Sequence, residues 1–111
     1  MRYYKLETYV PDFAAEALKA ALAAAGAGRY GNYSGCFWTV AGQGEFCPQP
    51  GSSPAVGEIG VTARVPEIKL ETLVAECHLG DVQAALRRNH PYETPACYIF
   101  ELVNLPFENE A

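Results

Sequence analysis

The chain has 111 residues, which is room for one domain, and half of its residues are hydrophobic, which allows a packed core. Its formal net charge is −5. The few basic residues do not cluster beyond the pair Arg87-Arg88. This composition argues against nucleic acid or an anionic membrane surface as the main partner, because both require a basic face.

The N-terminal part of the sequence predicts a strand followed by a helix. Residues 3–10 alternate in polarity, as a half-buried strand does. An apolar repeat at helical spacing then runs from Phe13 to Ala25, with Asp12 placed to cap its first turn and Gly26 placed to end it. The chain start has no apolar segment of a signal peptide, and the Ala-rich helix is too short and too charged to cross a bilayer. We therefore expect a cytoplasmic protein.

The central part predicts two further strands separated by a long loop. Cys36–Ala41 is rich in β-forming residues. A glycine- and proline-rich loop follows over 42–58. Strand character returns at 59–65, Pro66 indicates a bend, and 67–75 alternates between apolar and charged side chains.

The C-terminal part predicts a helix and a last strand. Residues 78–89 carry an apolar stripe at helical spacing, and Pro91 ends the helix. Ala96–Leu105 predicts the last strand, and 106–111 a surface tail. The order strand–helix–strand–strand–helix–strand is typical of the ferredoxin-like fold, an α+β sandwich with two helices on one face of an antiparallel sheet.

The predicted edge strands suggest self-assembly. In a ferredoxin-like fold the second and last strands lie at the sheet edges. Here the second strand carries Phe37 and Trp38 on opposite faces, and the last strand is almost entirely apolar on both. Such edges promote pairing or aggregation unless they are covered. We therefore expect a homo-oligomer whose subunits cover these edges.

The loop 42–58 is the first candidate binding element, because structureless loops of this length are uncommon in compact domains and are often functional. It contains no Lys or Arg and does not lead into a helix, which argues against a phosphate-binding loop. It is either a folded cap or a surface for a protein partner or ligand. Its candidate residues are Phe46, Pro48, Gly51, Pro54 and Gly57, with Glu58 as a candidate ligand at its end.

The turn His90-Pro91-Tyr92-Glu93 is the second candidate. His90 and Glu93 stand three residues apart across a rigid turn, so both can face one divalent metal ion or another ligand, and Tyr92 between them is a further ligand candidate. Two protein ligands are fewer than a closed zinc site requires. In the structural alternative, His90 caps the preceding helix, Tyr92 packs its ring and Glu93 bonds to local backbone.

Cys77 and His78 are weaker metal candidates, together with Cys47 or Cys97. A thiol and an imidazole just before a helix can bind a soft metal, but this spacing is not diagnostic and free cysteines are mostly buried packing residues. None of the four cysteines forms a CxxC pair, so we expect reduced thiols. No serine lies in a G-x-S-x-G motif, and no complete catalytic site is recognisable.

An ordered set of short motifs resembles a known family. The set comprises Gly31-Asn-Tyr-Ser-Gly-Cys-Phe37, Gly42-x-Gly44-x-Phe46-x-Pro48, Pro54-x-x-Gly57-Glu58-x-Gly60 and His90-Pro-Tyr-Glu-x-Pro-Ala96. Together these motifs resemble the YqfO-type insert domain found in many bacterial members of the Nif-three-like dinuclear-metal protein family. The resemblance covers residues 3–102 and is specific as an ordered set, although each motif alone is weak.

The resemblance implies a fold like that of CutA and PII signalling proteins, which are trimers of ferredoxin-like domains. It implies one stand-alone domain over 1–111, without the flanking halves that hold the family's two-metal site, so dimetal chemistry is not carried over. The family's usual Tyr-Asp-Ile-Tyr after Pro-Ala is replaced here by Cys97-Tyr98-Ile99-Phe100, so no acidic role is expected at position 98.

Three functions follow from these observations. The leading one is a non-enzymatic, trimeric PII/CutA-like binding or regulatory module whose loop 42–58 contacts a partner. The second is copper or zinc binding through His90 and Glu93 with a cysteine from the same or a neighbouring chain. The third is an enzyme with its active site between subunits.

Overall fold

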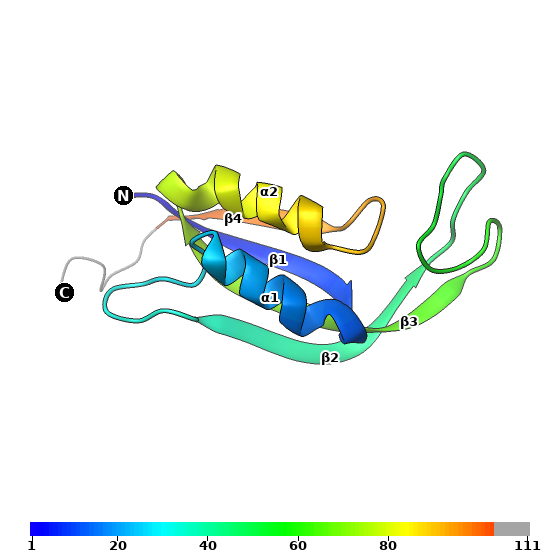
Figure 1. The fold of residues 1–111 in the computed structure, drawn as a ribbon, viewed down its shortest axis with the longest axis horizontal. Helices are drawn as coiled ribbons and strands as arrows, with labels where there is room; N and C mark the ends of the chain where they lie inside the picture. The colour runs from blue at the N-terminus through cyan, green and yellow to red at the C-terminus, as the bar shows by residue number, and fades with distance from the viewer. Residues whose placement is uncertain (104–111) are drawn as a thin grey trace.

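The computed structural model describes residues 1–103, which form a four-stranded antiparallel sheet with two helices on one face (Figure 1). The elements in chain order are β1 (Tyr3–Pro11), α1 (Ala15–Ala24), β2 (Phe37–Phe46), β3 (Ala63–Ala75), α2 (Leu79–Asn89) and β4 (Cys97–Leu102). A short 3₁₀ turn precedes each helix. The predicted fold class and element order are therefore confirmed.

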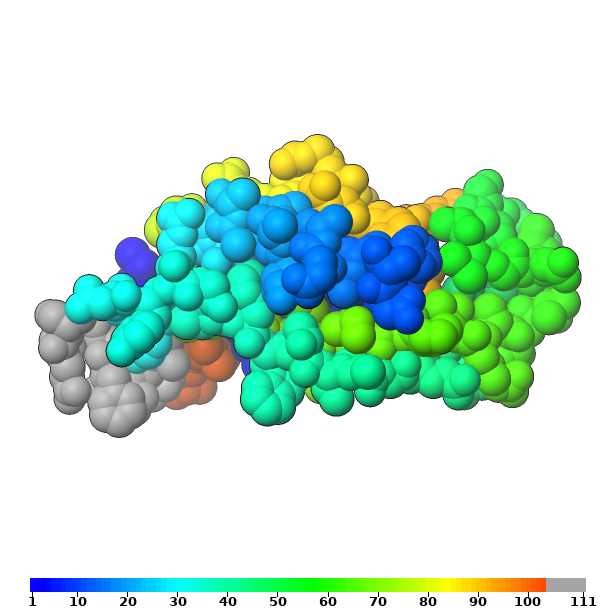
Figure 2. All heavy atoms as spheres, turned by 60° about the horizontal axis from the view of Figure 1, so that its bottom comes forward, coloured from blue at the N-terminus to red at the C-terminus, as the bar shows by residue number. Residues whose placement is uncertain are grey.

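The strands lie in the order β2-β3-β1-β4, so β2 and β4 are the edge strands, as predicted. β1 pairs with β3 only as far as Pro11↔Glu67, whereas β2 and β3 stay paired as far as Phe46↔Ala63. The last pairs of β2 and β3 thus lie beyond the end of β1. With the segment between them they form an arm, residues 43–66, that projects from the domain (Figure 1) and makes one end of the molecule (Figure 2).

The hydrophobic core lies between the sheet and the two helices. Its largest members are Leu6 and Val10 of β1, Leu70 and Val74 of β3, Leu18 and Leu22 of α1, and Val82 and Leu86 of α2. Full burial of each such side chain contributes about 1.5–3 kcal/mol. The core residues of β1 and β3 are even-numbered, as the alternation in the sequence requires, so the odd-numbered side chains of these strands lie on the opposite side, here called the open face. Val65 and Glu67 of β3 are buried on this open face. No helix within residues 1–103 is long and apolar enough to cross a membrane.

The start of the first helix differs from the prediction. Asp12 makes no capping hydrogen bond, because residues 12–14 form a 3₁₀ turn and α1 begins at Ala15. Phe13 lies in this turn with 75% of its surface exposed, so it is not part of the helix's buried stripe. The helix ends as expected: Gly26 has a φ of +118°, a left-handed conformation that glycine adopts without steric cost.

β2 is longer than the predicted Cys36–Ala41 and includes residues 42–46, which the sequence assigned to the loop. Glycine is depleted in strands and common in loops, but Gly42 and Gly44 occupy paired strand positions. A glycine inside a strand often marks the close approach of a neighbouring group, and this is the case at Gly44.

The remaining irregular segment is therefore 47–62 rather than 42–58, since β3 begins at Ala63 instead of Ile59. β3 also runs through Pro66, where a bend was expected. Pro66 lies one position beyond the end of β1, so β3 has only β2 as a neighbour there. A proline is tolerated in a strand where its missing N–H is not required for pairing.

β4 is shorter than the predicted Ala96–Leu105. It ends at Leu102, and residues 104–105 and the predicted tail 106–111 lie outside the described residues.

Candidate functional site

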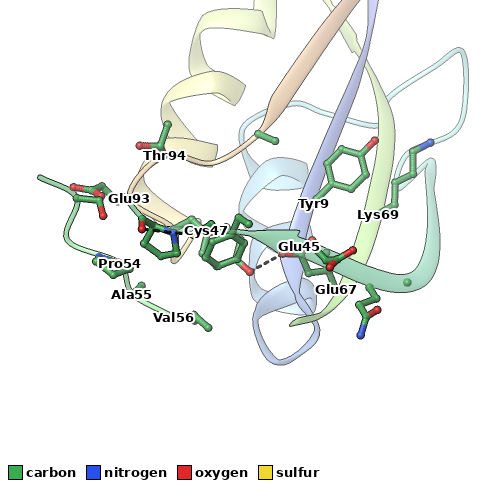
Figure 3. A pocket seen from close by; sticks show the side chains of 18 of the residues that line it. Tyr9, Glu45, Cys47, Pro54, Ala55, Val56, Glu67, Lys69, Glu93 and Thr94 are labelled. Carbon is green, nitrogen blue, oxygen red and sulfur yellow. Dashed lines mark hydrogen bonds between the residues drawn. The ribbon is translucent and has the colours of Figure 1, made fainter. Parts of the chain in front are cut away.

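A pocket of about 700 Å³ lies on the open face, between the arm and the turn that connects α2 to β4. Figure 3 shows Glu93 and Thr94 of this turn on one side of the pocket and Tyr9 and Lys69 of the sheet on the other. Apolar walls come from Val40, Phe46, Pro54 and Val56. The pocket thus combines residues from four separate parts of the sequence.

Glu67 is the most buried charged side chain of the pocket, with 8% of its surface exposed. The hydroxyl of Tyr92 donates a hydrogen bond of 2.6 Å to Oε2 of Glu67, drawn as the dashed line in Figure 3. A Cβ at Gly44 would overlap the carboxylate of Glu67. The glycine in β2 therefore provides the space that the carboxylate occupies.

The second carboxylate oxygen of Glu67 opens to the pocket. Among residues 1–103, Oε1 has no hydrogen-bond or ion-pair partner. Every side-chain oxygen that lacks a partner in this part of the chain is accessible to solvent, so Oε1 is accessible as well. Oε1 is the atom of Glu67 that lies nearest to a Cβ built at Gly44, and both residues line the pocket.

The phenol of Tyr92 stays protonated as a donor. Burial, together with the hydrogen bond to Glu67 and the negative charge of that residue, raises the pKa of Tyr92 well above its usual range. Its ring also packs against Phe46 in an edge-to-face arrangement with a centroid distance of 5.3 Å. Tyr92 therefore joins the turn to the sheet through its hydroxyl and to the arm through its ring.

His90 uses both ring nitrogens within the fold. Nε2 donates to the carbonyl oxygen of Tyr9 at 2.8 Å, since a carbonyl can only accept. Nδ1 therefore carries the lone pair and accepts the backbone N–H of Tyr92 at 3.1 Å. Burial lowers the pKa of His90, which favours this neutral form. In this arrangement neither nitrogen is available to a metal ion. His90 caps the end of α2 through its backbone N–H, which donates to the carbonyl of Leu86, whereas its ring binds β1 and the turn rather than the helix.

Glu93 connects the turn to the arm. Its Oε1 accepts the backbone N–H of Ser53 at 3.0 Å, although both groups are exposed. The sequence offered a metal ligand or a partner of local backbone, whereas the structure places the bond 40 residues away along the chain. Glu93 and Tyr92 are thus the two side chains of the turn that contact the arm.

The segment 47–62 is folded on itself. The N–H of Gly60 donates to the carbonyl of Pro48 at 2.8 Å, and the hydroxyl of Ser52 donates to the carbonyl of Gln49 at 2.7 Å. A Cβ at Gly57 would lie 3.2 Å from Ala63, so the segment packs closely at this point. These contacts correspond to the folded cap considered from the sequence.

The loop candidates divide into two groups. Phe46, Pro48 and Pro54 line the pocket, whereas Gly51 and Gly57 do not. Glu58 is exposed and also lies outside the pocket lining. Among residues 1–103, no hydrogen bond or ion pair joins Glu58 to His90.

Cys77 and His78 lie at the other end of the sheet. They follow Ala75, which pairs with the start of β1, whereas Cys97 pairs near the end of β1 and Cys47 belongs to the arm. The structure thus separates the thiols that the sequence grouped, and all four cysteines are free. The ring of His78 packs over Gly26, where a Cβ would come within 2.6 Å of it. Within residues 1–103, no three His, Cys, Asp or Glu side chains form a group that could hold a metal ion.

Sequence reasoning missed Glu67. It was assigned to the charged side of an alternating strand, where exposure is the normal outcome. The available signal was Gly44 in the neighbouring strand, because a glycine inside a strand often indicates that another group approaches closely.

Comparison with known proteins gives the chain its relatives. Over 98 residues it is 47% identical to the GTP cyclohydrolase 1 type 2 homolog of Mycobacterium tuberculosis, a match that covers 88% of this chain and 26% of the relative. A solved structure of a Bacillus cereus protein related to NIF3 matches with a TM-score of 0.80 at 36% identity, over 93% of this chain and 26% of that one. The chain corresponds to one domain of the NIF3-related proteins. It spans about a quarter of the length of these relatives.

The NIF3-related assignment confirms the family resemblance seen in the motifs, although no protein-family model matches the chain. CutA1 of Oryza sativa shares the fold with a TM-score of 0.70 at 14% identity, over 96% of this chain and 85% of that one. GlnK of B. subtilis, solved as a complex with ATP, gives a TM-score of 0.63 at 14% identity, over 94% and 84%. At such low identity these two matches show the fold alone, which is CutA/PII-like.

Proposed function

We propose that this NIF3-related domain is a CutA/PII-like binding module that assembles with copies of itself and takes a small ligand in the pocket beside the arm. The observation that carries the proposal is Glu67, a buried carboxylate with one oxygen open to an otherwise largely apolar pocket. Small-molecule sites typically occupy about 300–1,000 Å³ and combine apolar walls with a few placed polar groups. The pocket matches this description in both size and chemistry.

The ligand site is tested by an NMR fragment screen on the uniformly labelled chain. Fragments that bind the pocket are expected to shift the backbone amides of Gly44, Glu67 and Thr94 together, because these residues line it from three different segments. Fragments that shift only amides outside the pocket, such as those of Cys77 and His78, would contradict the assignment.

Self-assembly is supported by apolar side chains along both edges of the open face. Trp38 of β2 is 67% exposed, and Tyr98 and Phe100 of β4 are 52% and 50% exposed. Large apolar patches are uncommon on monomeric proteins and often mark interaction sites. A trimer is the favoured assembly, because the family resemblance implies it.

Sedimentation velocity at micromolar concentration tests the assembly. The wild type is expected to sediment as one species larger than a monomer, and the double variant Trp38→Glu with Phe100→Glu as a monomer. Phe13→Glu is the matched control, because Phe13 is equally apolar and 75% exposed but lies beside the helices. A monodisperse wild-type monomer would refute self-assembly.

The arm also supports the proposed contact with a protein partner. Ile59 and Val61 are 51% and 52% exposed, and both lie in the segment between β2 and β3. Recovery of the same partner by wild type and by Ile59→Ser with Val61→Ser would count against this contact, provided that the variant keeps its melting temperature.

Metal binding by His90 and Glu93 has less support. Both ring nitrogens of His90 are occupied by backbone groups, and the carboxylate of Glu93 holds Ser53. Calorimetry with copper and zinc on wild type and His90→Ala distinguishes the two proposals. Heat that depends on His90 would restore the metal hypothesis.

A further inference from the structure

We infer that the pocket takes a small organic cation, in which an apolar or aromatic body carries a protonated amine or amidine that pairs with Glu67. This inference rests on the proposed function, because it names the class of ligand for the same pocket. It follows from the charges around the pocket, the state of the groups beside Glu67 and the shape of the walls.

Four charged side chains line the pocket, and two of them form ion pairs. Glu45 pairs with Arg64 at 2.9 Å. Glu93 has no cationic partner among residues 1–103, but it is exposed to solvent and accepts the N–H of Ser53. The ammonium of Lys69 is shared between Glu71 at 3.6 Å and Glu7 at 3.9 Å. Glu67 is the fourth, and among residues 1–103 it has no cationic partner.

The groups that surround Glu67 do not neutralise it. The side chain of Tyr92 supplies one uncharged hydroxyl donor. His90 is close enough to interact electrostatically with Glu67, but burial lowers its pKa and both of its nitrogens bind backbone groups, so it stays neutral. A buried carboxylate normally has a charged partner or several donors, because removing it from water is costly. A ligand cation at Oε1 would supply the missing partner.

The walls suit the body of such a ligand. Aromatic rings of Phe46 and Tyr92 lie on the side of the arm and turn, and Val40 lies on the sheet. Aromatic faces attract cations in addition to contributing apolar contact. A ligand that carries phosphate or carboxylate would instead meet Glu67, while the lining contains no Arg and its one Lys is held by two carboxylates. The pocket therefore selects against anions.

Three compounds with the same indole ring test this selection. Tryptamine carries an ammonium group, tryptophol a hydroxyl and indole-3-propionate a carboxylate. Dissociation constants come from NMR titration of the wild-type chain at pH 7. We expect tryptamine to bind about tenfold or more tightly than tryptophol, as a charge-assisted hydrogen bond implies. Indole-3-propionate is expected to bind most weakly.

Two variants test whether the preference for the cationic ligand depends on the carboxylate of Glu67. Glu67→Gln keeps an acceptor for Tyr92 and removes the charge, so tryptamine should lose its advantage over tryptophol. Glu45→Gln is the matched control, because Glu45 also lines the pocket but is paired with Arg64, and it should keep the advantage. The wild-type ranking needs no variant, so the test stands even if Glu67→Gln unfolds.

The outcomes separate the two proposals. If the fragment screen finds pocket ligands but tryptamine binds no better than tryptophol, or indole-3-propionate binds best, the ligand class is overturned and the pocket remains a site. An unchanged ranking in folded Glu67→Gln also overturns the ligand class. If neither the screen nor the three indoles shift the pocket amides, the proposed function fails as well.

Discussion

The carboxylate of Glu67 fills the space in which any residue larger than glycine at position 44 would place its first side-chain atom. The two residues lie on adjacent strands, and the hydroxyl of Tyr92 closes the arrangement from the turn after α2. This three-residue contact joins the sheet, the arm and the turn at the floor of the pocket.

Replacing Gly44 with alanine should therefore be destabilising. The new methyl group would displace the carboxylate and weaken its bond to Tyr92, and overpacking of this kind costs about 1–3 kcal/mol. Gly42→Ala is the matched control, since the same strand leaves open space there within 4 Å. Urea unfolding of both variants measures the difference. Equal losses of stability would show that the effect comes from glycine in a strand and not from contact with Glu67.

Removing the hydroxyl of Tyr92 should also lower stability. Tyr92→Phe leaves Oε2 of Glu67 without its donor, and a hydrogen bond to a charged group contributes about 1.5–3 kcal/mol. Tyr33→Phe should change little, because Tyr33 is 76% exposed. A double-mutant cycle with Glu67→Gln isolates the pair energy. Additive effects in that cycle would mean that the two side chains act independently.

The stability of the folded chain should fall as the pH is lowered, because His90 is neutral in the fold. Burial lowers the pKa of His90 in the folded chain below its ordinary value of 6.5, so the unfolded chain takes up a proton first as the pH falls. The contribution of neutral His90 to the free energy of unfolding is thus fully present above about pH 6.5. It declines at lower pH until His90 is protonated in the folded chain too. Urea unfolding measured across this pH range should show that the free energy of unfolding falls more steeply with decreasing pH for wild type than for His90→Gln.

NMR of the imidazole rings provides a second measurement of His90 that requires no destabilising change at that residue. The titration midpoint of His90 should lie below its ordinary value, with the proton on Nε2 at neutral pH. The chain has only two histidines, so one substitution at His78 assigns the signals. A raised midpoint, or a proton on Nδ1, would contradict the hydrogen bonds described for the turn.

Loss of the carboxylate of Glu93 should loosen the arm without unfolding the domain. Glu93→Gln weakens the bond to the N–H of Ser53, so exchange of that amide with solvent should accelerate. The melting temperature should change little, because the bond is exposed. Glu58→Gln, an exposed acid in the same segment, is the control and should leave the exchange of Ser53 unchanged.

The fold could be predicted because its determinants are local. The alternation of β1 distinguishes the helix-covered side of the sheet from the open side, and Leu6 and Val10 are buried as that pattern requires. The order of the predicted elements and the ordered motifs both indicate the ferredoxin-like topology, and the strand order confirms it.

The pocket could not be predicted because its contacts join residues far apart in the sequence. Tyr92 and Glu67 are 25 residues apart, and Glu93 and Ser53 are 40 apart. Both pairs depend on the arm folding beside the turn, which no periodicity encodes. Gly44 concealed the length of β2 for the same reason, since its role is defined by the side chain of Glu67 on the neighbouring strand.

The arm has a consequence for how this domain tolerates change. None of the residues 47–62 belongs to the buried core among the described residues, and the segment starts and ends on neighbouring strands at Phe46 and Ala63. Insertions and substitutions there alter one rim of the pocket while leaving the core untouched. The segment is therefore suited to grafting and library selection, in which new binding preferences can be acquired on an unchanged scaffold.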